Sequence, residues 1–521
     1  MALDEESKVM GAELNSTQVV SAFNRIPYGL ISKEATHPTH DLLSEFVRIA
    51  GCYKRSRAST SIKARSFFSE GSNGDYVPSN MHYKMSASLI DKEARFLFAE
   101  APRISVTGVS DASELDEASK QTLGDINGML QAIFKENMLE SQLLKAAKDC
   151  FIGKRVAGIV NFNEDGVTIS FVPSTQFIYE YKLNTRELEK FVAFIVIHDS
   201  VNISERRIFM KKYQLKQQLP DQDVRVYLTE ALYDGSGKLL EQYGEDLELA
   251  IPFIPAIVIL NDGLTGDIYG KSEISVLKDY ESWYAKLANA DADAERKSMN
   301  PIKYTVDMDG RSTKDLSTAA GAYWDLGSDQ NLDKPSPKVG IIESNMAYSS
   351  ALKTTLDRIK TVGYEQVDVP NITLESLPGT IVSGKALKAI YWPLIVRCKE
   401  KMKTWGPQLE KMVRQIVDGA IAFPECISKY VSNPISEVPY EVHIDQKIPL
   451  PEDKIEEKTM DLSEVQSGTM SKKSYMKKWR GLTDNEAQQE LEQMALERQM
   501  LDEVSFPLPA VVDDGEASQG V

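Results

Sequence analysis

The spacing of apolar residues changes along this chain from helical to strand-like and back, and this change limits the possible folds. Spacings of three to five residues predict helices at 41–50, 82–98 and 119–149, the last as one long helix. From residue 155 apolar and polar residues alternate, and Gly- and Asp-rich turns separate the runs, which is typical of an antiparallel meander. The predicted strands are 155–162, 167–172, 191–197, 206–213 and 224–232, followed by a buried extended segment at 251–260.

Helical spacing returns at residue 272 and dominates the rest of the chain. Residues 272–298 place Leu277, Tyr280, Tyr284 and Leu287 on one face, which predicts a seam for packing on another helix. At a rise of ~1.5 Å per residue, this helix would be about 40 Å long. Further expected elements are helices at 345–362, at 383–422 with an interruption at Gly406-Pro407 and over much of 451–500, and a strand at 438–444. The sequence therefore predicts a mainly helical α+β protein.

Charge, cysteine content and hydropathy exclude several classes of protein. The 521 residues carry a net charge of −17, whereas a domain that grips nucleic acid is usually basic, because the neutralisation of phosphates dominates its affinity. The four cysteines form no Cys-x-x-Cys pair, so we expect free, mostly buried thiols rather than a zinc knuckle. The longest apolar run, 249–260, contains two prolines and is shorter than the ~20 residues that span a membrane.

Two segments approach the P-loop pattern that binds nucleotide phosphates. Residues 266–272 follow an apolar segment and open a helix, but they have three residues between the glycines where four are required. Residues 379–386 have the correct spacing but end in alanine, so that no hydroxyl can reach magnesium. Since each segment lacks a necessary part, we expect no nucleotide site at Lys271 or Lys385.

No other pattern predicts catalysis. His37 and His40 could supply two metal ligands, but no third ligand follows at a suitable spacing, and a surface loop is the simpler interpretation. The sequence has no Gly-x-Ser-x-Gly elbow. We therefore expect a protein without catalytic residues, without a metal and without a cofactor.

Two basic clusters stand out from the acidic chain. One surrounds Tyr475 and Trp479, and its cations are Lys472, Lys473, Lys477, Lys478 and Arg480. Cations interleaved with aromatic residues can contact a nucleic-acid backbone, but a solvated helix face with Trp479 packed inward is an equally good interpretation. The other cluster, at 54–65, has five cations and no acid, and contact with a neighbouring subunit is preferred there over contact with DNA.

Four segments resemble one family, the portal proteins that connect head and tail in tailed double-stranded DNA phages. The segments are 85–106 (MSASLIDKEARFLFAEAPRISV), 146–172 (beginning AAKDCFIGKRVAGIV), 251–291 (IPFIPAIVILN and GKSEISVLKDYESWYAKLANAD) and 383–394 (SGKALKAIYWPL). Each is a weak signal alone, but their order and spacing over most of the chain are specific.

The resemblance implies a portal-type fold that assembles into a ring. It divides the chain into a wing (1–270 and 383–448, the latter a long helix and a strand), stem helices (271–300 and 345–366), a clip (301–344), a tunnel loop (367–382), a helical crown (449–502) and a disordered tail (503–521). For the tunnel loop, a surface loop folded over the wing is the alternative.

The resemblance also implies a function and a set of partners. About twelve copies would form a channel at one capsid vertex for the packaging and ejection of double-stranded DNA. The partners would be that DNA, the terminase large subunit, a head-tail adaptor protein, and the major capsid and scaffolding proteins, with no membrane. The protein would assemble in the host cytoplasm and end in the virion. The acidic chain agrees with such a channel, since a duplex slides freely only where few cations hold it.

Three sets of residues are expected to contact the DNA. The crown cations named above form one set. The tunnel-loop residues expected to face the duplex are Thr373, Glu375, Ser376 and Thr380. The candidate channel cations on the stem helices are Lys286, Arg296, Lys297, Lys353 and Lys360.

Two other classes of protein stay open on the sequence alone. An oligomeric tail or baseplate protein would also be acidic, and a ring with a central channel would distinguish a portal from it. A nucleotide-driven motor would depend on the near-miss loops and would hydrolyse ATP.

Overall fold

The computed structural model of this chain divides into two compact units, residues 1–376 with 391–449, and residues 377–390 with 450–521. Each unit is described here by itself. The residues described are 26–34, 48–49, 51–53, 78–81, 83–109, 116–183, 185–200, 202–216, 224–265, 267, 269–299, 302–306, 338–342, 346–371, 384–431, 434–447, 449, 454–480 and 484–503. Most of the helix expected at 41–50, the basic cluster 54–65 and His37 with His40 lie outside them.

Helices α5 (Met85–Leu97), α6 (Glu117–Glu136) and α7 (Leu139–Gly153) begin the larger unit. The prediction of one helix over 119–149 was wrong, because the chain breaks at Asn137 and Met138, the latter with a left-handed φ of 48°. The Asn137 amide explains the break: it donates to Val167 O at 2.9 Å and accepts from Ile169 N at 2.8 Å. The Asn137 side chain thus ties the end of α6 to the strand edge at Val167 and Ile169.

Three of the four sheets among the described residues contain strands from residues 103–260. In the three-stranded sheet, β2 (Arg155–Asn163) pairs with β3 (Gly166–Pro173) and with β9 (Ala256–Leu260), both antiparallel. A two-stranded sheet joins β1 (Arg103–Gly108) to β12 (Tyr440–Asp445), which lie far apart in the sequence. The third is a five-stranded meander in the order β4-β5-β6-β7-β8.

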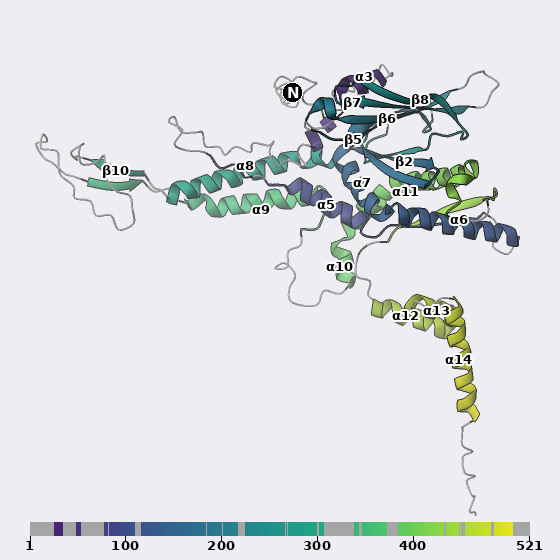
Figure 1. Ribbon diagram of the computed structural model, residues 1–521. Helices are drawn as coiled ribbons and strands as arrows, with labels where there is room; N and C mark the ends of the chain where they lie inside the picture. The colour runs from purple at the N-terminus through teal and green to yellow at the C-terminus, as the bar shows by residue number, and fades with distance from the viewer. Residues whose placement is uncertain are drawn as a thin grey trace, which may run out of the picture. The chain divides into compact units, whose positions relative to one another are not determined.

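The meander consists of β4 (Phe177–Tyr181), β5 (Leu188–His198), β6 (Arg207–Lys216), β7 (Arg225–Asp234) and β8 (Leu239–Leu249). The expectation of antiparallel strands is confirmed, but the five predicted strands do not form one meander: three of them are β5, β6 and β7, whereas the first two, β2 and β3, belong to the three-stranded sheet. The alternation did not reveal β4 and β8. Helix α3 (Tyr28–Glu34) covers one face of the meander, where Leu30 and Ile31 pack against Phe194 (Figure 1). The Glu34 carboxylate at the end of α3 lies 3.0 Å from Lys212 Nζ on β6.

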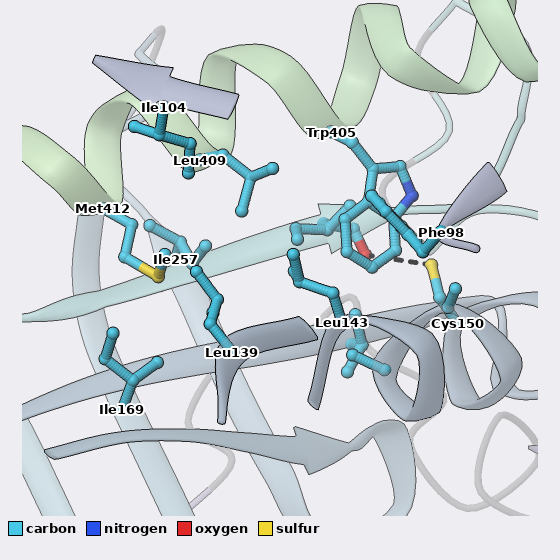
Figure 2. Packing of buried hydrophobic residues seen from close by; sticks show 14 of the residues in the cluster. Phe98, Ile104, Leu139, Leu143, Cys150, Ile169, Ile257, Trp405, Leu409 and Met412 are labelled. Carbon is cyan, nitrogen blue, oxygen red and sulfur yellow. Dashed lines mark hydrogen bonds between the residues drawn. The ribbon is translucent and has the colours of Figure 1, made fainter. Parts of the chain in front are cut away.

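The main core lies between the helices and the three-stranded sheet. Figure 2 shows Leu143 of α7, Ile257 of β9 and Trp405 of α11 (Trp392–Ala422) converging in it. Three of the four cysteines are buried and none forms a disulfide. Cys150 lies within this core, its thiol 3.7 Å from Ile259 O, and burial raises its pKa.

Helix α11 is continuous through Gly406 and Pro407, so the interruption predicted there was wrong. The interruption comes earlier, at Tyr391, between α10 (Gly384–Ile390) and α11. Pro393 stands in the first turn of α11, where a proline loses no helical hydrogen bond. Pro407 does lose one, but Trp405 and Leu409 on either side of it are fully buried, and this packing stabilises the helix.

The helical hairpin of the larger unit consists of α8 (Glu273–Met299) and α9 (Ser349–Glu365), which lie side by side (Figure 1). Strands β10 (Ile302–Val306) and β11 (Lys338–Ile342) pair between them in the sequence. The expected long helix is confirmed, but its buried face is different from the predicted seam. Of that seam only Leu277 is buried, and the other buried positions on the same face are Glu281, Ala285, Asn289 and Asp293. No helix in the described part of the chain is long and apolar enough to cross a membrane.

The smaller unit is helical in its described part. Besides α10 it contains α12 (Lys454–Ser467), α13 (Lys472–Arg480) and α14 (Asp484–Glu503). Met476 of α13 and Ala487 of α14 are buried. The residues after 503 lie outside the described chain.

The connection from β9 to α8 depends on Gly270, which has a left-handed φ of 73°. A Cβ at this position would lie 2.5 Å from Lys154 O and 2.9 Å from Asn261 O, both of which are backbone atoms that cannot move aside. Gly270 is therefore required for close packing of the chain rather than for approach to a phosphate.

We predict that Gly270→Ala lowers the free energy of unfolding by about 3 kcal/mol, from the left-handed strain and the clash together. The control is Gly237→Ala in the same unit, where φ is 85° but the nearest atom to a Cβ is 3.7 Å away. Gly237→Ala introduces only the left-handed backbone strain, so its free energy of unfolding should fall by only ~1–2 kcal/mol. Denaturant unfolding of both variants measures the difference, and equal losses would contradict this account of Gly270.

Candidate functional site at the base of the helical hairpin

The buried face of α8 becomes polar along its length, and its polar side chains hold the extended segment that leads into α5. Asn289 Oδ1 accepts from Met81 N at 2.7 Å, and its amide donates to Met81 O at 3.0 Å. One turn further along α8, Asp293 Oδ1 accepts from Ser79 N at 2.8 Å. Ser86 at the start of α5 donates to Glu281. These bonds give the backbone of residues 79–81 the partners that a sheet would otherwise supply.

At the base of the hairpin, four charged side chains form a buried ion network from three helices. Glu93 comes from α5, Glu273 is the first residue of α8, and Arg397 and Lys401 lie one turn apart on α11. Arg397 donates through Nε to Glu93 Oε1 and through NH2 to Glu273 Oε2, both at 2.7 Å. The exposed fraction of each of the two carboxylates and of the Lys401 side chain is below a tenth. The network therefore fixes α5, α8 and α11 to one another.

Lys401 completes the network and connects it to the end of β9. Its ammonium group lies 2.8 Å from Glu273 Oε1 and 3.2 Å from Glu93 Oε1. It also donates to Asn261 Oδ1 at 2.7 Å and lies 3.9 Å from the centre of the Phe151 ring. All of its donors thus meet an acceptor or a ring face, as a buried ammonium group requires.

The two carboxylates differ in their hydrogen bonding, and their pKa values move in opposite directions. Burial alone would raise the pKa of Glu273, but the charges and hydrogen bonds of Lys401 and Arg397 outweigh burial and lower it to about 2. Burial raises the pKa of Glu93, and the nearby charge of Glu273 adds to this effect. Glu93 Oε2 has no hydrogen-bond partner, whereas both oxygens of Glu273 have one. Glu273 is therefore the permanent anion of the network.

The same network holds the chain just after α9. Asp368 Oδ2 lies 3.4 Å from Arg397 NH1, and Asp368 has a left-handed φ of 53°. Val367 and Val369 on either side of it are buried. The structure is described as far as residue 371 and again from 384, so Arg397 anchors the near end of the segment expected to be the tunnel loop. The loop residues Thr373, Glu375, Ser376 and Thr380 lie outside the described residues.

The candidate channel cations lie on the hairpin, mostly exposed. Lys286, Arg296 and Lys297 on α8 and Lys353 on α9 are exposed, whereas Lys360 is half-buried. Lys286 lies over the Trp283 ring at 5.9 Å, and Arg296 lies 3.6 Å from Asp293. Exposure allows these cations to meet a ligand but does not assign them one.

The five crown cations fall on α13, and Lys478 and Arg480 pair with acids inside the smaller unit. Lys478 lies 2.7 Å from Asp461 of α12, and Arg480 lies 2.8 Å from Glu490 of α14. Trp479 donates to Asp461 at 2.8 Å and is half-buried, as in the interpretation of a solvated helix face. The hydrogen bonds from Lys478 and Trp479 lower the pKa of Asp461. Lys472 and Lys477 are exposed, and Lys473 is half-buried.

The first near-miss P-loop is turned into the protein. Ser272, which would have to reach magnesium, is buried, and its hydroxyl donates to Ile152 O at 2.6 Å. Lys271 N donates to Asn261 O at 2.7 Å. The backbone and the hydroxyl of this segment are therefore occupied in fixing the start of α8. Most of the second segment, 379–386, lies outside the described residues.

The sequence analysis missed the ion network, although a signal for it was present. Arg397 and Lys401 stand on the apolar face of α11, which also carries Cys398 and Trp405, and Glu93 stands on the apolar face of α5. Charged residues on an apolar helix face are rarely buried unless they are paired. The positions predict that such partners exist, but not which residues they are.

The buried ion network joins helices, and this structural role agrees with the comparison to known families. A family model described as phage portal protein, SPP1 Gp6-like, matches residues 57–504, most of the chain. No curated protein matches it. The chain belongs to this family of phage portal proteins. The predicted resemblance is confirmed, and with it a structural, non-enzymatic role in the phage capsid.

We predict that Glu273→Gln destabilises the protein at neutral pH by about 3–5 kcal/mol, because it leaves two buried cations with too little negative charge. Since folding lowers the pKa of Glu273 from 4.5 to about 2, its stabilisation is complete above pH 4.5 and is lost as the pH falls toward 2. The variant should therefore lose the part of the acid-induced decrease in stability that falls in this range.

The control is Glu410→Gln on α11, whose partner Arg414 is 2.8 Å away but partly exposed, as is Glu410. Glu410→Gln should lower the free energy of unfolding by less than about 1 kcal/mol. Denaturant midpoints measured from pH 7 to pH 2.5 test the pair of variants. A Glu273→Gln variant as stable as the control would show that the network does not hold the hairpin.

Proposed function

We propose that this chain is one subunit of a closed ring of about twelve copies that forms the DNA channel at one capsid vertex. The family match over 57–504 carries the proposal. The hairpin supports it, because a monomer would leave large apolar side chains in water, with exposed fractions of 54% for Trp283 and 78% for Met299. Neighbouring subunits in a ring would cover such surfaces.

In this ring the α8–α9 hairpin forms the stem, and β10 and β11 belong to the clip. Terminase during packaging, and later a head-tail adaptor, would dock on the clip, while capsid and scaffolding proteins would surround the wing. The net charge of −17 per chain supports passage of DNA without adhesion, since few cations would hold the phosphates. Lys286, Arg296, Lys297, Lys353 and Lys360 are the proposed cations of the channel wall.

The tunnel loop, 367–382, is proposed to form the narrowest part of the channel. Asp368 at the base of the loop pairs with Arg397 of α11, and this pairing supports a loop whose first residues are held in place. Thr373, Glu375, Ser376 and Thr380 would then face the duplex, with hydroxyls and one acid that bind phosphates weakly. For the crown, Lys472, Lys473, Lys477, Lys478 and Arg480 of α13 are the proposed cations for DNA contact, and Lys478 and Arg480 would have to exchange an acidic partner for a phosphate.

We predict that the purified chain assembles into a ring of about twelve subunits. Native mass spectrometry measures the stoichiometry directly, and electron micrographs show whether a central channel is present. A stable monomer at micromolar concentration, or an open filament, would contradict the proposed function and favour another structural role in the virion.

Deleting 371–380 tests the tunnel loop separately from ring assembly. The deletion begins after the buried Val369, so we expect rings of unchanged stoichiometry but impaired packaging or retention of DNA in an in vitro packaging assay. Loss of the rings would mean that the loop is structural. Normal packaging by intact rings would place the constriction elsewhere.

A further inference from the structure

A groove opens between α8 and α9. It has a volume of about 460 Å³ and is lined by Val276, Asp279, Tyr280, Trp283, Ile359 and Gln366. At 100° per residue, Val276, Asp279 and Trp283 of this lining point away from Glu281, which faces Ser86 of α5. The groove is apolar and aromatic and contains one carboxylate, so it fits an apolar segment that carries a single cation.

A stripe of matching chemistry lies on the exposed face of α11. Trp392, Val396 and Lys399 follow one another at spacings of four and three residues and so share one side of the helix. The exposed fractions are 58% for Trp392 and 38% for Val396. The side chains of this stripe point away from Arg397 and Lys401, which face the ion network.

The stripe and the groove are two different surfaces of one block of helices. Within it, α5 contacts α8 through Ser86 and contacts α11 through Glu93. A contact between two different patches of a subunit is a head-to-tail contact, which is the kind of contact that generates rings. Among the described residues, Asp279 and Lys399 each lack an ion-pair partner, so each is available to a neighbouring subunit.

We propose that the α11 stripe of one subunit docks into the α8–α9 groove of the next copy of the same chain, with Trp392 and Val396 against Trp283 and Ile359, and Lys399 against Asp279. This inference rests on the proposed function, since it names the contact that closes the ring. Its occupant is a second copy because the chain itself supplies the complementary apolar surface and the complementary charge.

A charge exchange tests the contact in the full-length chain. Asp279→Lys and Lys399→Glu should each raise the subunit concentration for half-assembly about tenfold or more, because each places like charges together. The double variant should restore assembly toward that of the wild type, which a simple loss of folding could not do. Single variants that assemble like the wild type, or a double variant worse than both, would overturn the proposal.

Cross-linking gives a second test that does not depend on assembly energies. With Trp392→Cys and Trp283→Cys in one chain, a short bis-maleimide should produce a ladder of linked oligomers that ends at the full ring. The wild type, Trp392→Cys alone and Trp392→Cys with Leu183→Cys, whose position is 88% exposed on the wing, provide the background. Rings without a ladder would overturn this contact and leave the proposed function intact. A wild-type chain that forms no rings would overturn both.

Discussion

The arrangement of the larger unit depends on two buried cations that must be paired. Arg397 and Lys401 of α11 lie among apolar side chains, where an unpaired charge is far more costly than in water. Their pairing brings Glu93 of α5 and the first residue of α8, Glu273, to the same point. Because desolvation offsets much of the attraction in a buried ion pair, we infer that the network mainly selects one arrangement of the helices.

The position of the hairpin follows from this arrangement. The network fixes α8 at its first residue, and Glu281, Asn289 and Asp293 further along the helix bind α5 and the segment before it. α9 returns along α8 and ends at Glu365, and Asp368 just after it is paired with Arg397. The groove opens between the two helices of this hairpin.

Much of the fold could be predicted from the sequence, because most elements bury one regular apolar face. The helices near 85 and 272 and six of the strands, β12 among them, were found by this signal. The break at Asn137 was missed because its cause is a strand edge that only the tertiary structure brings near. The polar face of α8 was missed for the same reason, since Asn289 and Asp293 look like solvent-facing residues until their partners are known. The predicted interruption of α11 at Pro407 was wrong because core packing around Trp405 outweighs the tendency of proline to break a helix.

The central claim is that the hairpin of each subunit forms the wall of a closed channel. Electron cryo-microscopy of the purified full-length chain tests it most directly, because the map places α8 and α9 relative to the ring axis. The account predicts a closed ring in which the hairpins stand side by side around the channel, with the buried network intact at the base of each. A closed ring with the hairpins on its outer rim, away from the channel, would contradict it.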